Sequence, residues 1–156
     1  MSSSSTIVIG IGNGLRRDDG VGLYAAHMIK KLAIENVTVI EGIGDGYALL
    51  EAWSGCDRAI VVDCTISGKA VGTIFRFDAL SENIPADLFN GYSTHSISVV
   101  DAVELGKVLG RVPQSLVIFG IEGQDVSPGD RLTPEVEKAA DHLIRLITQE
   151  LSVDTN

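Results

Sequence analysis

The chain has 156 residues, a net charge of −9 at neutral pH, and a hydrophobic fraction of 45% with only 5% aromatic residues. These values predict a single domain over residues 1–156 with an aliphatic core, and the negative charge argues against nucleic acid or anionic membranes as partners. No apolar run approaches the ~20 residues of a membrane span, and Met1–Ser5 lack the features of a signal peptide. We expect a cytoplasmic protein without membrane insertion, with Cys56 and Cys64 reduced. Residues 1–5 and 152–156 are expected to be flexible tails.

Five short segments predict the strands of one sheet. Three of them, Thr6–Ile11, Ala59–Val62 and Leu116–Ile121, are continuous apolar runs, as is typical of parallel strands that are buried on both faces, and Val37–Ile40 is a fourth strand. The fifth alternates between apolar and polar residues, which favours an edge position and antiparallel pairing. In chain order the predicted strands are Thr6–Ile11, Val37–Ile40, Ala59–Val62, Gly72–Phe77 and Leu116–Ile121.

Segments with helical periodicity lie between these strands. The last helix has the clearest start, because Thr133 suits the N-cap and Pro134 the first helical position. The other predicted helices cover Val21–Leu32, Tyr47–Trp53 and Ile97–Leu109. The alternation of strands and helices predicts an α/β fold, a three-layer α/β/α sandwich around a five-stranded, mostly parallel sheet.

The first loop, in IVIGIGNGLRRDDGVG, is rich in glycine but does not match a nucleotide-binding turn. Leu15 stands where the dinucleotide fingerprint needs its third small residue, and no Gly-Lys-Ser/Thr follows. Asp18 and Asp19 lie where a phosphate would meet the helix N-terminus and would repel it unless a cation came between them. The same place suits a carboxylate that binds a metal, or one that only caps the helix beginning near Gly20.

Three polar residues follow the strand ends at which open α/β sheets bind their ligands. Asp19 follows the first strand, Asp63 ends the run AIVVD, and His95 lies in the polar loop GYSTHS before a helix. Oxygen and nitrogen donors of this kind suit Zn, Ni, Mn or Fe. An Asx turn or a cap is the alternative role for Asp63. Glu122, at the end of the last strand, has either a substrate contact or a structural role in its loop.

The chain resembles the hydrogenase maturation endopeptidases, which trim the C-terminal extension from the precursor of the [NiFe] hydrogenase large subunit. Besides the first loop, the resemblance rests on AIVVDCTISGKAVGTIFRF (Ala59–Phe77), STHSISVVDAVELG (Ser93–Gly106) and FGIEGQDVSPGDRLTPEV (Phe119–Val136). These blocks follow in the family's order and span most of the chain. The family's fold is an α/β/α sandwich around a five-stranded sheet, in agreement with the periodicity.

The resemblance implies a site and a partner. It makes Asp19, Asp63 and His95 the ligands of a nickel ion that the hydrogenase large-subunit precursor carries, so that the isolated protein can be without metal. It also implies an aspartyl-type endopeptidase. Our mechanistic hypothesis is that the cation polarises the scissile carbonyl or a water molecule, with Asp19 or Asp63 helping as the base.

Two stretches depart from the family pattern. The family's substrate-recognition segment, often Gly-Gly-Thr, corresponds here to EGIGDGY, which supplies Gly42, Gly44, Asp45 and Gly46 but no threonine. The block after His95 reads HSISVVD in place of a glycine-leucine pair. The alternatives that the sequence leaves open are a non-catalytic module that binds a metal centre, a nucleotide-binding α/β domain, and a hydrolase for another small amide or peptide.

Overall fold

The computed structural model describes residues 5–43, 46–89 and 98–153. Its five strands form one sheet in the order β2-β1-β3-β5-β4. Four strands are parallel, and β4, at the edge, pairs antiparallel with β5. This confirms the predicted mostly parallel sheet and its antiparallel edge strand. The strands are β1 (Thr6–Gly10), β2 (Val37–Glu41), β3 (Arg58–Thr65), β4 (Ile74–Asp78) and β5 (Ser115–Glu122).

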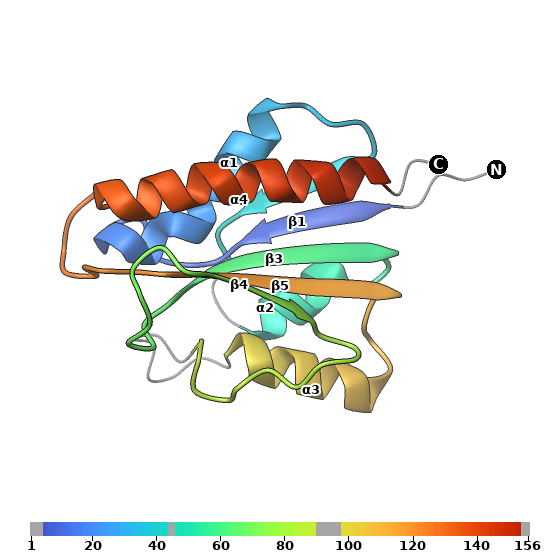
Figure 1. Ribbon diagram of the computed structural model, residues 1–156. Coiled ribbons are helices and arrows are strands. Elements are labelled where there is room, and N and C mark those ends of the chain that lie inside the picture. Colours follow the sequence, from blue (N-terminus) through green and yellow to red (C-terminus); the bar gives the residue numbers. More distant parts are fainter. Residues whose placement is uncertain (1–4, 44–45, 90–97, 154–156) are drawn as a thin grey trace.

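The helices complete the three layers (Figure 1). Helices α1 and α4 cover one face of the sheet, and α2 and α3 cover the other. The helices are α1 (Val21–Lys31), α2 (Gly46–Trp53), α3 (Val99–Leu109) and α4 (Pro134–Val153), and a short 3-10 helix, η1 (Arg17–Gly20), precedes α1. Among the described residues, no helix is both long and apolar enough to cross a bilayer.

The central strands are buried because they carry apolar side chains toward both helical layers. All five residues of β1 and all eight residues of β3 are buried. Successive side chains of a strand point to opposite faces, so Ala59 and Val61 pack toward α2 and α3 while Ile60 and Val62 pack toward α1 and α4. The buried stripe of α4 consists of Val136, Ala140, Leu143, Ile147 and Leu151.

Two glycines of the first motif let α1 pack directly against the sheet. A Cβ atom on Gly22 would lie 2.4 Å from the carbonyl oxygens of both Ile11 and Val62. A Cβ atom on Gly10 would lie 2.2 Å from the carbonyl oxygen of Gly22. These glycines are therefore required by the close approach of helix and strand, and they need no phosphate to explain them.

Some element bounds differ from the prediction. Strand β3 runs to Thr65, so Asp63 lies inside the strand and does not end it. Helix α4 reaches Val153, so the first two residues of the predicted C-terminal tail are helical. At the other end, the Ser5 amide donates a hydrogen bond to the Asp57 carboxylate, so the last residue of the predicted N-terminal tail is bonded to the domain. Ser98 caps α3: its hydroxyl accepts a hydrogen bond from the Asp101 amide, and the Asp101 carboxylate accepts one from the Ser98 amide.

Candidate active site

Asp63 lies near the carboxyl end of β3, with its carboxylate buried on the face of the sheet that α2 and α3 cover. Its position follows from the alternation along the strand, because Ala59 and Val61 point to the same face. The side chain is only 8% exposed. The backbone amide of Cys64 donates a hydrogen bond of 2.8 Å to its Oδ1 atom, and this is the one hydrogen bond that the Asp63 carboxylate accepts from the described residues.

Asp19 lies in η1, in the loop that follows the neighbouring strand β1. The loop turns back on itself, so that the Asn13 amide donates a hydrogen bond of 3.0 Å to Oδ2 of Asp19. The Asp19 amide in turn donates to the carbonyl of Arg16. Asp19 is half-buried, and its carboxylate, like that of Asp63, has one amide donor within the part of the chain that the structure describes.

The pKa values of Asp63 and Asp19 are both raised, which means that the ionised form of each carboxylate is disfavoured at this site. Burial raises the pKa of Asp63 well above its ordinary value, the Cys64 amide opposes this, and the negative charge of Asp19 raises the pKa further. Burial also raises the pKa of Asp19, against the lowering effects of the Asn13 amide and the charge of Arg16. A pair of this kind is relieved by a shared proton or by a cation that both oxygens approach.

Asp18, next in sequence to Asp19, has a different environment. It is fully buried, and its carboxylate accepts hydrogen bonds from the amides of Gln124 and Asp125 and from both the amide and the hydroxyl of Thr133. The start of α1 has no side-chain cap. The alternative role of Asp18 as a cap of that helix is therefore wrong, because its hydrogen bonds go to the loop that joins β5 to α4.

Glu122 is a second buried carboxylate whose oxygens are occupied. Thr65 and Ser67 donate to it through their hydroxyls, and Ser67 and Gly68 donate through their amides. This supports a structural role in the loop after β3. Asp18 and Glu122 are thus saturated with donors, whereas the carboxylates of Asp19 and Asp63 each accept only one hydrogen bond from the described part of the chain.

The third predicted ligand and part of the predicted recognition segment lie outside the described residues. These are His95, Gly44 and Asp45. Of the same segment, Gly42 has a φ of 95° and donates its amide to the carbonyl of Gly10, and Gly46 is the buried first residue of α2. Within the described ranges, His, Cys, Asp and Glu side chains form no group of three that would hold a metal ion.

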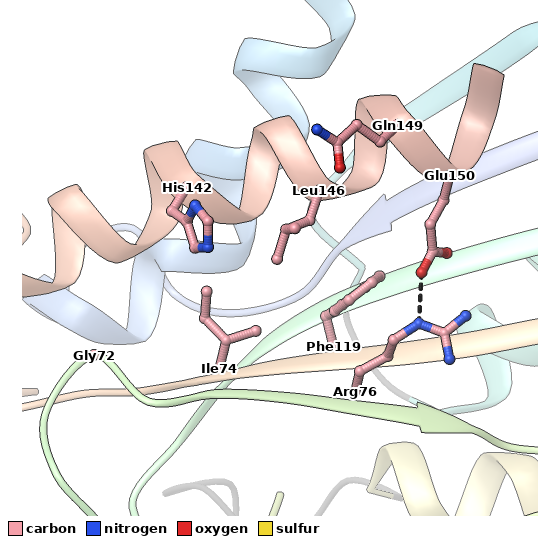
Figure 2. A pocket seen from close by; sticks show the side chains of 8 residues that line it. All are labelled: Gly72, Ile74, Arg76, Phe119, His142, Leu146, Gln149 and Glu150. Carbon is pink, nitrogen blue, oxygen red and sulfur yellow. Dashed lines mark hydrogen bonds and ion pairs between the residues drawn. The ribbon is translucent and has the colours of Figure 1, made fainter. Parts of the chain in front are cut away.

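A groove of about 580 Å³ lies elsewhere, between β4 and the C-terminal half of α4 (Figure 2). Ile74, Phe119 and Leu146 form its apolar part, and His142 faces it from α4. Its two charged side chains, Arg76 and Glu150, form an ion pair with each other. Neither Asp19 nor Asp63 lines this groove, so it is separate from the carboxylate pair.

The sequence contains no feature that distinguishes the hydrogen bonding of Asp18 from that of Asp19. The partners of Asp18 lie more than 100 residues away along the chain. Thr133 was predicted as an N-cap, and its carbonyl does accept the amide of Glu137 at the start of α4. Its hydroxyl, however, donates to Asp18, and this contact can be identified only from the folded chain.

The chain is a three-layer α/β protein in which two carboxylates at the carboxyl edge of the sheet each accept one amide hydrogen bond from the described residues, and open α/β sheets bind their ligands at this edge. The family described as "HycI: Hydrogenase maturation protease" matches residues 23–150, and the chain belongs to this family. The match includes Asp63 and begins just after Asp19. Membership makes the protein a peptidase, that is, a hydrolase.

Individual relatives agree with this assignment. The chain is 28% identical over 134 residues to the hydrogenase 2 maturation protease of Escherichia coli K12, over 84% of this chain and 80% of that protein. It is 32% identical over 151 residues to the hydrogenase expression/formation protein HupD of Bradyrhizobium diazoefficiens, over 94% and 77% of the two chains. The structure of the hydrogenase maturating endopeptidase HybD from E. coli shares the fold, with a TM-score of 0.81 at 24% identity over 97% and 94% of the chains.

Proposed function

We propose that this protein is a nickel-recognising endopeptidase that removes the C-terminal extension from the precursor of a [NiFe] hydrogenase large subunit. The observation that carries the proposal is the pair Asp19 and Asp63. Both carboxylates are wholly or partly buried at the carboxyl edge of the sheet, and each has one amide donor within the described chain. Burial of charge without compensation is unfavourable, and a divalent ion delivered by the substrate provides the compensation.

The hydrogen bonds orient each carboxylate for this task. The Cys64 amide holds Oδ1 of Asp63, and the Asn13 amide holds Oδ2 of Asp19. In each case the other oxygen accepts no hydrogen bond from the described residues, and we propose that it binds the ion. Carboxylate oxygens with an imidazole nitrogen suit nickel as a borderline metal ion, and we assign His95 as the third ligand.

In the proposed reaction, the substrate's nickel ion acts as a Lewis acid toward the scissile carbonyl or a water molecule. We assign the proton of the attacking water to Asp63, because its carboxylate lies at the carboxyl edge of the sheet and accepts a single amide hydrogen bond from the described residues. The water oxygen bonds to the carbonyl carbon, the C–N bond breaks, and the proton passes to the leaving amine. Asp19 keeps the ion in place from the adjacent loop.

Recognition of the precursor is assigned to the segment after β2. Gly42 bonds to the last residue of β1, so the segment starts beside the loop that carries Asp19. We propose that Gly42, Gly44, Asp45 and Gly46 contact the precursor. This segment contains no threonine. We therefore propose that this protein prefers a different large subunit from relatives that carry Gly-Gly-Thr.

The test is co-expression with candidate large-subunit precursors in medium with and without nickel, followed by intact-mass measurement of the precursor. We expect the precursor to lose the mass of its C-terminal extension only when both nickel and this protein are present. Expression of the precursor alone is the control for other proteases. A nickel-loaded precursor that keeps its full mass contradicts the peptidase proposal, and equal cleavage without nickel contradicts nickel recognition.

A further inference from the structure

Asp18 links the loop that carries Asp19 to the strand that carries Asp63. Its carboxylate lies in the loop between β1 and α1, yet its donors among the described residues all belong to the loop between β5 and α4. The distances to Oδ2 are 2.8 Å from the Gln124 amide and 2.9 Å from the Asp125 amide. The Thr133 amide donates to Oδ1 at 2.7 Å, and the Thr133 hydroxyl lies 2.9 Å from Oδ2.

The second loop is in turn fixed to β3. The Gly123 amide donates to the carbonyl of Thr65 at 2.9 Å. A Cβ atom on Gly123 would lie 2.9 Å from Sγ of Cys64 and 3.1 Å from Cβ of Asp18. Gly123 therefore fills the space between the end of β3 and Asp18. The adjacent amides of Gln124 and Gly123 bond to Asp18 and to Thr65, so one backbone step connects Asp18 to a residue two positions after Asp63.

Further bonds hold the two loops in one register. The Asp18 amide donates to the Asp125 carbonyl, and the Arg17 amide donates to the Gly129 carbonyl, each at 3.0 Å. The Gly129 amide donates to the carbonyl of Leu15. Arg17 has a φ of 44°, which is unfavourable for a residue with a side chain and persists only where the surroundings impose it.

We propose that Asp18 is a positioning residue, which sets the place of Asp19 relative to Asp63 by joining the two loops through its buried carboxylate. Asp18 is 0% exposed, so it cannot touch a substrate and acts only through its neighbour. The effect of Asp18 on catalysis rests on the proposed function. The effect of Asp18 on the position of the Asp19 carboxylate does not.

The Asn13 amide reports on that position without any substrate. It donates to Oδ2 of Asp19, so its chemical shift and hydrogen-exchange rate change when the carboxylate moves. The Ile11 amide is the internal reference. It donates to the Val62 carbonyl at 2.9 Å and so joins the start of the same loop to β3, without a bond to Asp18 or Asp19.

The experiment compares Asp18→Asn with Glu122→Gln by NMR and by precursor cleavage. Both substitutions replace one oxygen of a saturated, buried carboxylate with a donor, but only Asp18 joins the loop of Asp19. In Asp18→Asn we expect the Asn13 amide to shift and exchange faster while Ile11 stays protected. We also expect kcat to fall by about 100-fold with little change in KM, as for a small displacement of a reacting group.

Two results would overturn the inference: an unchanged Asn13 amide in folded Asp18→Asn, or an equal fall of kcat in Glu122→Gln. If Asp18→Asn does not fold, Thr133→Val removes one donor to Asp18 and should change the Asn13 amide in the same direction by a smaller amount; no change there also overturns the inference. If the wild-type protein leaves the precursor intact, the proposed function fails, and the Asn13 amide alone decides the role of Asp18.

Discussion

The substitution Gly22→Ala tests why the first motif is rich in glycine. The new methyl group would meet the carbonyl oxygens of Ile11 and Val62 at 2.4 Å, and neither oxygen belongs to a flexible side chain. To reach an ordinary contact distance of 3.4 Å, α1 has to move away from β1 and β3 by about 1 Å. Overpacking of this kind costs about 3 kcal/mol at its upper end, and the better helix propensity of alanine returns at most ~1 kcal/mol.

We therefore expect the free energy of unfolding to fall by about 2 kcal/mol, measured by urea denaturation followed by circular dichroism. The matched control is Gly14→Ala in the same motif. A Cβ atom there would lie 3.4 Å from the flexible side chain of Leu23, which is an ordinary contact. A Gly22→Ala protein as stable as Gly14→Ala would refute the close-packing explanation.

Stabilisation of the wild-type protein by a nucleotide without metal would favour the nucleotide-binding alternative instead.

Two further predictions concern stability away from the site. Burial and the hydrogen bond to Asp141 raise the pKa of Tyr24 to about 12. The unfolded state thus loses this proton first, and the contribution of Tyr24 to stability is present below pH ~10 and lost as the pH rises toward 12. The free energy of unfolding, measured by urea denaturation, should decline less steeply between pH 9 and 11.5 in Tyr24→Phe than in the wild type. The control is Tyr47→Phe at an exposed position, which should decline like the wild type. Equal slopes for Tyr24→Phe and the wild type would count against the Tyr24–Asp141 bond. Ser98→Ala removes the capping box of α3 and should lower the free energy of unfolding by about 1 kcal/mol, and a loss below the error of the urea titration would contradict that cap.

The sheet and its helices could be predicted because each element carries its own periodic signal. Strands buried on both faces appear as continuous apolar runs, and the start of α4 is marked by a threonine of the type that suits an N-cap and by a proline. The end of β3 was missed for a physical reason. Asp63 interrupts the apolar run, which favours a strand end, but the register with β5 continues through Cys64 and Thr65.

The roles of the acidic residues could be predicted only in part. Spacing and resemblance selected Asp19 and Asp63, and the structure gives both a raised pKa. The same sequence signal applied equally to Asp18 and Glu122, which prove to be saturated by donors from distant loops. The distinction depends on how many hydrogen bonds each buried carboxylate receives, and this is a property of the folded chain.

The most direct test of the account is the rate at which a nickel-loaded large-subunit precursor loses its extension with wild-type protein, Asp63→Asn and Glu104→Gln. Asp63→Asn keeps the shape of the buried side chain and removes its charge, whereas Glu104 is an exposed residue of α3. We predict that Asp63→Asn remains folded but cleaves at least ~100-fold more slowly, and that Glu104→Gln cleaves like the wild type. Cleavage by Asp63→Asn at the wild-type rate would contradict the assignment of the carboxylate pair.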